Sequence, residues 1–575
     1  MKKIQILLII FTTILLFTSC DDLFYVDDRE RIDEEIVVSK NADVSAMWAY
    51  LYHGLTNGFQ HVNQAMLANA CDEADLNQPF HSVQIFNDGS WNSINNPENY
   101  YYTFYNQIRN ACKFLQVTDT ANNSRFTYEE YRVADPPLYH RYRREMKAYR
   151  IDASFFKAYY HFELWKRYKN IPIINKVITE EESKTLKQNS SEEIIDYIID
   201  LLDDVIAQFD ELSLMEGVEY VNNKWSDQHY GRITKGVALA LKTRVLLYAA
   251  SPLNTSTGMY DKQLCEAAAK AAAELINLNI YSTNISYREL QFNKNSNNPE
   301  NILDARVNTT GTFNYMESWN YPQGGAELYV TPSVGSNATC PSQNLVDAYE
   351  TIDGSPVDEN NPYINRDPRL KHSILCNGDI FNGEAVQSYV NGLAGIGKRN
   401  CTTTGYYLKK FVQNEVRLPN GENTSHIWYV FRYSEVLLNY AEAMFYAFGP
   451  DVKKGYITSG GDLSAVDAIN KIRNRSDVGM PSITNLTEEK LRNERRVELA
   501  FEGHRFWDVR RWKIAEQTEN IPLMGMQITK NGDTYVYDKV EIEPRVFQSK
   551  MYHFPIPYNE MKNYPNWDQN EGWSF

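Results

Sequence analysis

The sequence predicts a mostly α-helical protein in which a scaffold of helical hairpins carries a loop-rich inserted subdomain. Two observations predict this fold class. In a series of segments before residue 280 and after residue 431, apolar residues recur every three or four positions, which marks one buried face on each helix. The stretch 281–431 is instead rich in Asn, Gly, Thr and Tyr, with little helical periodicity, which is typical of loops.

The helical patterns follow one another along the chain. The first covers 148–165 and stops before Pro172, and the second covers 194–209. Ser190, with Glu193 three residues later, forms a capping box at the start of the second. Further patterns lie at 238–248, 264–275, 433–444, 465–472 and 487–501. Successive pairs with alanine-rich stripes favour stacked hairpins similar to a tetratricopeptide array, although no strict repeat of that kind is present.

The N-terminus indicates export. Lys2 and Lys3 precede an apolar run from Ile4 to Phe17. As a helix this run would rise about 21 Å, too short for a hydrocarbon core of about 30 Å. We therefore expect residues 1–19 to be a signal peptide.

The residues around Cys20 indicate a lipid anchor. Small residues before Cys20 resemble the lipobox of bacterial lipoproteins, whose cysteine is acylated. Asp21 and Asp22 resemble the tag that exports lipoproteins of Bacteroidota-type bacteria to the outer face of the outer membrane. We therefore expect a protein that faces the cell exterior and is held at the outer membrane by lipid alone.

Composition excludes some partners and leaves the cysteines undecided. Lys and Arg number 58 and Asp and Glu 74, a net charge of −16 that argues against nucleic acid as a partner. No two cysteines are close enough for a CxxC zinc or redox motif, and no metal ligand or cofactor is predicted. Whether calcium assists stays open. One disulfide among Cys340, Cys376 and Cys401 remains open.

No compact catalytic motif appears in the sequence. A glycosidase needs only two carboxylates at a set separation, and that alternative stays open. The densest acidic group is Asp72, Glu73 and Asp75. We expect it to be a solvated turn or a hydrogen-bonding cap rather than a catalytic pair.

Aromatic residues in loop-like segments indicate sugar binding. Trp91 follows a turn, and Tyr315, Trp319 and Tyr321 lie in a Gly- and Asn-rich segment. Sugar rings stack their C–H faces on exposed aromatic rings, while Asn and Asp bind hydroxyl groups. Local packing is the alternative for both tryptophans. The predicted ligand-binding residues are Asp75, Trp91, Asn95, Asn96, Tyr315, Trp319 and Tyr321.

The segment from Glu494 to Asp508 alternates acids and bases and is expected to be structural. Arg495 and Glu498 are one helical turn apart and can pair. Asn485 is the expected N-cap of this helix, and Gly503 suits its left-handed exit.

These motifs together resemble the SusD/RagB family, the surface lipoproteins of Bacteroidota nutrient-uptake systems. The resemblance covers nearly the whole chain after the signal peptide. It is carried by Glu145 through Pro172, Gly231 through Pro252, Arg366-Asp-Pro-Arg369, Thr404 through Lys410, Arg432-Tyr-Ser-Glu435, Glu494 through Trp512 and Phe554 through Trp573.

The resemblance implies a fold, a role and a partner. It implies tetratricopeptide-like hairpins divided into an N-terminal helical region (20–280), the loop-rich insertion (281–431) and a C-terminal helical region (432–575). It implies a non-enzymatic protein that captures a glycan and delivers it to a SusC-like TonB-dependent outer-membrane transporter. Likeness of the stretch before Trp91 to the starch-binding founding member supports Trp91, Asn95 and Asn96. A peptide-capturing relative, and a lid protein without a soluble ligand, are the other classes left open.

Overall fold

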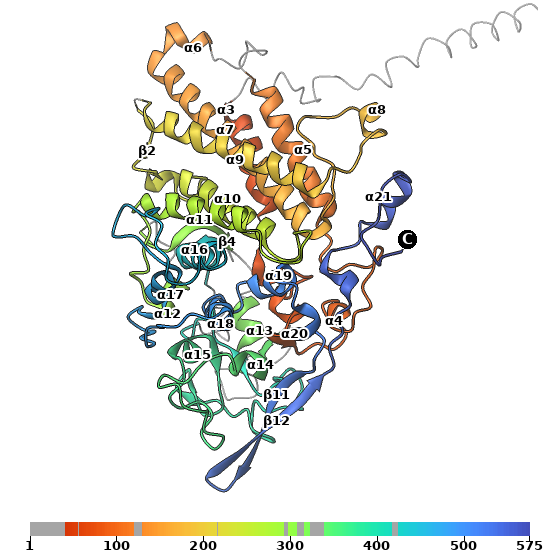
Figure 1. Ribbon diagram of the computed structural model, residues 1–575, viewed down its shortest axis with the longest axis vertical. Coiled ribbons are helices and arrows are strands. Elements are labelled where there is room, and N and C mark those ends of the chain that lie inside the picture. The colour runs from red at the N-terminus through yellow and green to blue at the C-terminus, as the bar shows by residue number, and fades with distance from the viewer. Residues whose placement is uncertain are drawn as a thin grey trace, which may run out of the picture.

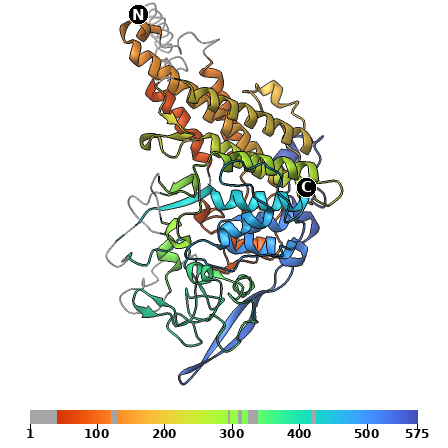
Figure 2. The ribbon, with the colours of Figure 1, turned by 60° about the vertical axis from the view of Figure 1, so that its left-hand side comes forward.

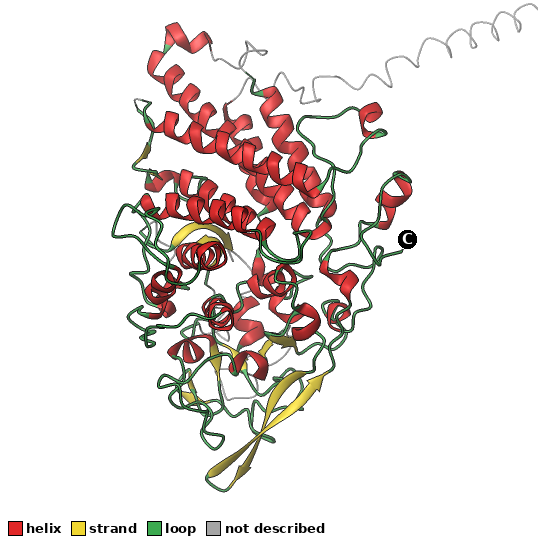
Figure 3. Ribbon diagram, in the orientation of Figure 1, coloured by secondary structure: helices red, strands yellow, loops and turns green. Residues whose placement is uncertain are grey.

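The computed structural model describes residues 41–55, 57–119, 129–215, 217–292, 297–307, 315–322, 338–416, 422 and 424–574. Long helices are stacked at one end of an elongated molecule, and short helices, short strands and loops form the other end (Figure 1; Figure 3). Both ribbon views show the β11–β12 hairpin projecting from the loop-rich end, opposite to α6 (Figure 2).

The main scaffold is a series of helices, each of which packs against the next. Its members are α5 (Tyr101–Val117), α7 (Pro136–Tyr168), α9 (Ser191–Ser213), α10 (Lys235–Ala250), α11 (Lys262–Asn277), α16 (Tyr433–Phe448) and α17 (Ala465–Arg473). This order confirms the predicted scaffold of helical hairpins. No helix in the described part of the chain is long and apolar enough to cross a membrane.

Shorter elements complete the fold. Further helices are α3 (Asn41–Tyr50), α4 (Gln84–Asn87), α6 (Glu129–Ala134), α8 (Glu180–Ser183), α12 (Tyr287–Leu290), α13 (Tyr315–Asn320), α14 (Gln343–Val346), α15 (Pro368–Ser373), α18 (Glu488–Glu498), α19 (His504–Arg511), α20 (Ala515–Thr518) and α21 (Tyr558–Asn563). The 3₁₀ helices are η2 (Leu51–Gly54), η3 (Gly58–Gln60), η4 (Leu67–Ala70), η6 (Asp227–His229) and η8 (Ser549–Tyr552).

The strands form separate antiparallel pairs rather than one sheet. The pairs are β1 (Ala74–Leu76) with β5 (Thr339–Pro341), β2 (Tyr220–Val221) with β3 (Lys224–Trp225), β4 (Asn301–Val307) with β10 (His426–Arg432), β6 (Ile374–Leu375) with β9 (Tyr407–Leu408), β7 (Ile380–Phe381) with β8 (Glu384–Ala385), and β11 (Leu523–Asn531) with β12 (Thr534–Glu543).

The helix ends show how closely local sequence sets the scaffold. The capping box before α9 is present: the Ser190 hydroxyl accepts from the Glu193 backbone N–H, and the Glu193 carboxylate accepts from the Ser190 N–H. The predicted N-cap of α18 is wrong, because Thr487 rather than Asn485 caps it. Gly503 is left-handed, with φ of 76°, but it precedes α19.

The buried apolar residues form two large clusters. One runs from Val44 to Phe554 and joins the N-terminal and C-terminal helices in a common core. The other is built mainly from residues of the loop-rich stretch together with the β11–β12 hairpin. The predicted boundary between residues 431 and 432 falls inside β10. The division into three regions therefore stays a prediction.

A buried ion network lies where these parts meet. The Glu498 carboxylate accepts hydrogen bonds from Arg369 at 3.1 Å, Arg432 at 2.8 Å and Arg475 at 3.3 Å. Arg432 also binds Glu502, at 2.7 Å. Burial alone would raise the pKa of Glu498, but the three guanidinium groups outweigh it and hold that pKa well below its usual range. Several of the motifs that carry the family resemblance are therefore parts of one internal network.

One sequence expectation about pairing needs correction, and one question that the sequence left open is answered. Arg495 does not bind Glu498; its Nε donates to Asp508 at 2.7 Å. The open question of a disulfide is also answered, because the six cysteines in the described part of the chain are all free and buried. They pack as small apolar side chains.

Candidate functional site

The structure fixes α13 within the loop-rich end of the molecule. The Asn320 side chain donates to the Met316 carbonyl at 2.9 Å and accepts from the Thr339 backbone N–H at 3.0 Å. Glu317 accepts from the Gln413 N–H at 2.9 Å, and its other oxygen lies 3.1 Å from His426 Nε2. α13 is thus held by β5, by β10 and by the loop after β9.

Trp319 is half-buried on this anchored helix. Tyr321, just after it, is fully buried, and its hydroxyl donates to the Val416 carbonyl at 3.0 Å. The sequence predicted that Tyr321 flanks a ligand. Its burial and its hydrogen bond indicate instead that it supports the helix. The side chain of Tyr315 lies outside the described residues.

Asp75, another predicted ligand-binding residue, lies close to α13 in the fold. Its side chain is buried. It sits opposite Cys340 in the β1–β5 pair. Its carboxylate accepts from the Thr403 hydroxyl at 2.6 Å and from the Gln84 amide at 3.2 Å. With both oxygens engaged, Asp75 joins β1 to the loop before β9.

Trp91 does not lie in an exposed arc. It is 2% exposed, and its ring centroid is 5.1 Å from that of Phe86, 5.1 Å from that of Phe554 and 4.8 Å from that of Trp573. These rings cover its faces, so local packing, the alternative named for this residue, describes Trp91.

Asn95 and Asn96 follow Trp91 in the same loop and lie nearer to solvent. Asn95 is exposed and Asn96 half-buried. The Asn96 side chain accepts from the Glu98 N–H at 3.0 Å. Trp91 belongs to the core cluster of the helices and Tyr321 to that of the loop-rich end. The structure therefore does not bring all the predicted residues into one site.

The acidic group at 72–75 is buried, so a solvated turn is wrong for it. Asp72 accepts from Arg505 at 2.8 Å and from Arg496 at 2.7 Å. Burial opposes the ionised form of Asp72, but these arginines lower its pKa to about 2. For Glu73, burial and the Asp72 charge raise the pKa to about 8. The group holds α18 and α19 against the segment before β1.

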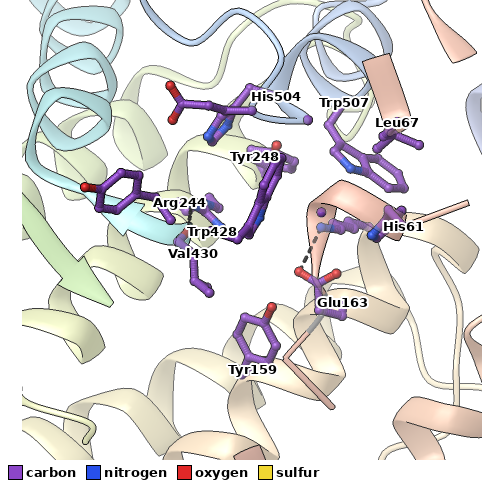
Figure 4. Close-up of a pocket in the computed structure, with 15 residues that line it drawn as sticks. His61, Leu67, Tyr159, Glu163, Arg244, Tyr248, Trp428, Val430, His504 and Trp507 are labelled. Atoms are coloured by element: carbon purple, nitrogen blue, oxygen red, sulfur yellow. Dashed lines mark hydrogen bonds and ion pairs between the residues drawn. The ribbon is translucent and has the colours of Figure 1, made fainter. Parts of the chain in front are cut away.

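A polar cavity of about 80 Å³ lies between the helical regions (Figure 4). Glu163, Lys166, Arg244 and His504 line it together with several aromatic rings. Burial lowers the pKa of Lys166 to about 8 despite the nearby Glu163. None of the lining residues is exposed, so the cavity suits a few ordered waters, at about 10–15 Å³ each, better than a polymer.

Sequence reasoning missed a second and larger pocket, of about 220 Å³. It lies between α5, α8 and α21 and is lined by Tyr102, Tyr105, Tyr564 and Trp567 among others. The tyrosines at positions 100, 101, 102 and 105 were the available signal. The other wall of the pocket comes from residues more than 450 positions later.

The structure is a stack of helical hairpins whose loop-rich end holds α13 and the half-buried Trp319. The SusD family model matches residues 299–573. A SusD-like protein of Formosa agariphila is 22% identical over 400 residues, which cover 65% of this chain and 68% of that protein. Residues 299–573 of the chain belong to the SusD/RagB family.

Solved structures establish the same fold. A SusD-like protein from Bacteroides fragilis superposes with a TM-score of 0.74 at 24% identity, covering 94% of this chain and 99% of that one. A SusD-like carbohydrate-binding protein from the same species gives 0.71 at 21% identity, covering 92% and 100%. A laminarin-binding SusD-like protein gives 0.63 at 20% identity, covering 93% and 100%.

Proposed function

We propose that this chain is a surface lipoprotein that captures an oligosaccharide and delivers it to a SusC-like TonB-dependent transporter. Family membership supports this role, as do relatives described as carbohydrate-binding and laminarin-binding. Cys20, the proposed lipid attachment site, and the signal peptide lie outside the described residues. Their assignment rests on the sequence, as does the outer-membrane location.

The observation that carries the proposal is that the helix bearing Trp319, α13, is fixed to its surroundings by hydrogen bonds. Glu317, Asn320 and Tyr321 are all joined to other segments by hydrogen bonds, and Trp319 between them is half-buried. An aromatic ring on a rigidly held helix loses little conformational entropy when a sugar ring stacks on it. In our proposal, Asp75 and Tyr321 help to position α13. Tyr315 and the Asn95–Asn96 loop remain candidates for contact with the oligosaccharide.

Replacing Trp319 by Ala is the direct test. Stacking contributes about 1–3 kcal/mol per ring by analogy with bases on aromatic side chains, so affinity should fall roughly 5- to 150-fold. Affinity electrophoresis of the full-length protein in detergent against plant, host and microbial polysaccharides measures this. Tyr50→Ala, which removes a 54% exposed ring on α3, is the matched control.

Retardation by one polysaccharide that is lost in Trp319→Ala and kept in Tyr50→Ala supports the proposal. The melting temperature of both variants should match that of the parent. Retardation that survives in Trp319→Ala would remove α13 from the site. Binding that peptides abolish would turn the assignment towards peptide capture.

A further inference from the structure

The pocket between α5, α8 and α21 is built from two distant parts of the chain. In Figure 1, α8 and α21 are labelled on the right of the molecule and α5 nearer to its middle. None of its lining residues belongs to the loop-rich stretch that contains α13. The lining residues are Tyr101, Tyr102, Tyr105, Asn106, Arg109, Pro172, Ile174, Lys176, Ile178, Ser183, Leu186, Glu560, Tyr564 and Trp567.

Its aromatic wall is held rigidly. The Tyr564 ring stacks on Trp567 with centroids 4.2 Å apart and planes 7° from parallel. The indole N–H of Trp567 donates to the Leu186 carbonyl at 2.9 Å. Gln188 and Asp568 exchange two further hydrogen bonds, of 3.0 and 2.8 Å, that join the tail to the segment after α8. The tail is therefore clamped on the helical region, and the rings are in place before a ligand arrives.

The opposite wall is formed by the first turns of α5. Tyr105 is fixed by its hydroxyl, which donates to the Pro172 carbonyl at 2.9 Å. Tyr102 is 44% exposed, so its ring is accessible. Tyr101 is 3% exposed, and its ring centroid lies 5.6 Å from that of Tyr102. The buried Tyr101 ring therefore supports the exposed one.

Polar groups surround these rings. The half-buried carboxyl of Glu560 lines the same pocket as Tyr102, and burial raises its pKa. Asn106, Arg109 and Lys176 are exposed at the rim. An aliphatic side chain of a peptide has no hydrogen-bonding group for the carboxyl, the amide and the two cations around the edge of the pocket. A pyranose has apolar C–H faces for the rings and a circle of hydroxyl groups for these polar groups.

We infer that this pocket binds a single saccharide ring, as a second sugar site separate from α13. Its volume lies below the roughly 300 Å³ at which pockets for larger ligands begin, which fits one ring rather than a chain. The inference goes beyond the proposed function and does not depend on α13 binding anything. Two sites on one body would let a polysaccharide bind with an avidity greater than either site provides.

The test is a titration of the full-length protein in detergent with D-glucose, D-galactose, D-mannose and D-xylose. Saturation-transfer NMR reports which sugar protons contact the protein. Tyr102→Ala removes the accessible ring, and Glu560→Gln keeps the shape of the side chain but removes its charge. Trp319→Ala and Tyr50→Ala are controls at the proposed α13 site and on an unrelated surface.

At least one sugar should show transfer to its C–H protons. Tyr102→Ala should weaken its binding at least about fivefold, and Glu560→Gln should also weaken it, with melting temperatures unchanged. Both controls should bind as the parent does. Loss of sugar binding in Trp319→Ala alone would support the α13 site and overturn the pocket between α5, α8 and α21 as a sugar site. Absence of transfer from all four sugars, or equal binding in every variant, would overturn it as well. Binding of proline-rich or aromatic peptides that Tyr102→Ala alone abolishes would assign the pocket to peptide side chains.

Discussion

Adjacent carboxyl groups at Asp72 and Glu73 are driven to opposite protonation states by their surroundings. Asp72 faces two arginines and remains ionised. Glu73 is 1% exposed; one oxygen accepts from the Phe501 N–H at 3.2 Å, and the other has no hydrogen-bond partner. Burial, and then the charge of Asp72, raise the pKa of Glu73 from 4.5 to about 8. The folded protein therefore keeps a proton on Glu73 at neutral pH.

This proton makes stability depend on pH in a defined direction. Between pH 4.5 and 8 the folded state binds the proton and the unfolded state does not, so the contribution of Glu73 to stability falls as pH rises through that window. Glu73→Gln should raise the free energy of unfolding at pH 8 by about 1–3 kcal/mol and leave it unchanged near pH 4. Urea unfolding at the two pH values measures this.

Asp72→Asn is the matched control for Glu73→Gln, and its effect has the opposite sign. It leaves two arginines without their carboxylate, so it should lower stability at pH 7. Equal effects of Glu73→Gln at pH 4 and pH 8 would show that the Glu73 carboxyl is ionised in the folded protein.

At the scale of single elements, the start of α9 is the clearest case of local sequence determining structure. The Ser190 hydroxyl accepts at 3.2 Å from the Glu193 N–H, and the Glu193 carboxylate at 2.8 Å from the Ser190 N–H. Ser190→Ala should lower the free energy of unfolding by about 1 kcal/mol. Ser213→Ala, at the other end of α9, should change it by less than about 0.5 kcal/mol. Urea unfolding distinguishes the two, and equal effects would argue against a role for the capping box.

Helical periodicity predicted where the scaffold helices lie, because each buries a face against its neighbours. It missed the first turns of α7, which begins at Pro136, since most residues there are exposed and show no apolar stripe. Periodicity also could not tell which of the two tryptophans, Trp91 or Trp319, is the more exposed. Trp91 is covered by Phe554 and Trp573, which lie more than 460 positions later, whereas Trp319 is not fully covered. Contacts of such long range leave no local pattern in the sequence.

Across the whole molecule, the same limit explains why the C-terminal charges were recognised as structural while their partners were not. Spacing suggested a pair within one helix. The structure instead joins Glu498 of α18 to Arg369 of α15, Arg432 of β10 and Arg475 after α17. The network therefore connects the loop-rich end with the C-terminal helices, and its integrity bears on how the whole chain unfolds.

Replacing Glu498 by Gln should destabilise the protein strongly, because three buried guanidinium groups would lose their shared carboxylate. Breaking such a network costs about 3–5 kcal/mol. Glu488→Gln is the control on the same helix: its carboxylate is 48% exposed and pairs with Arg492, so about 0.5 kcal/mol or less is expected. Urea unfolding at pH 7, followed by tryptophan fluorescence, measures both.

Acid gives a second readout of the same network. The pKa of Glu498 is lowered in the folded state, so its contribution is present above its unfolded value near 4.5 and is lost as pH falls below it. The parent should therefore lose stability more steeply than Glu498→Gln between about pH 4.5 and pH 2. Parallel stability curves for the two proteins over that range would show that Glu498 is not held ionised by its arginines. The connection between the two ends of the molecule would then rest on apolar packing.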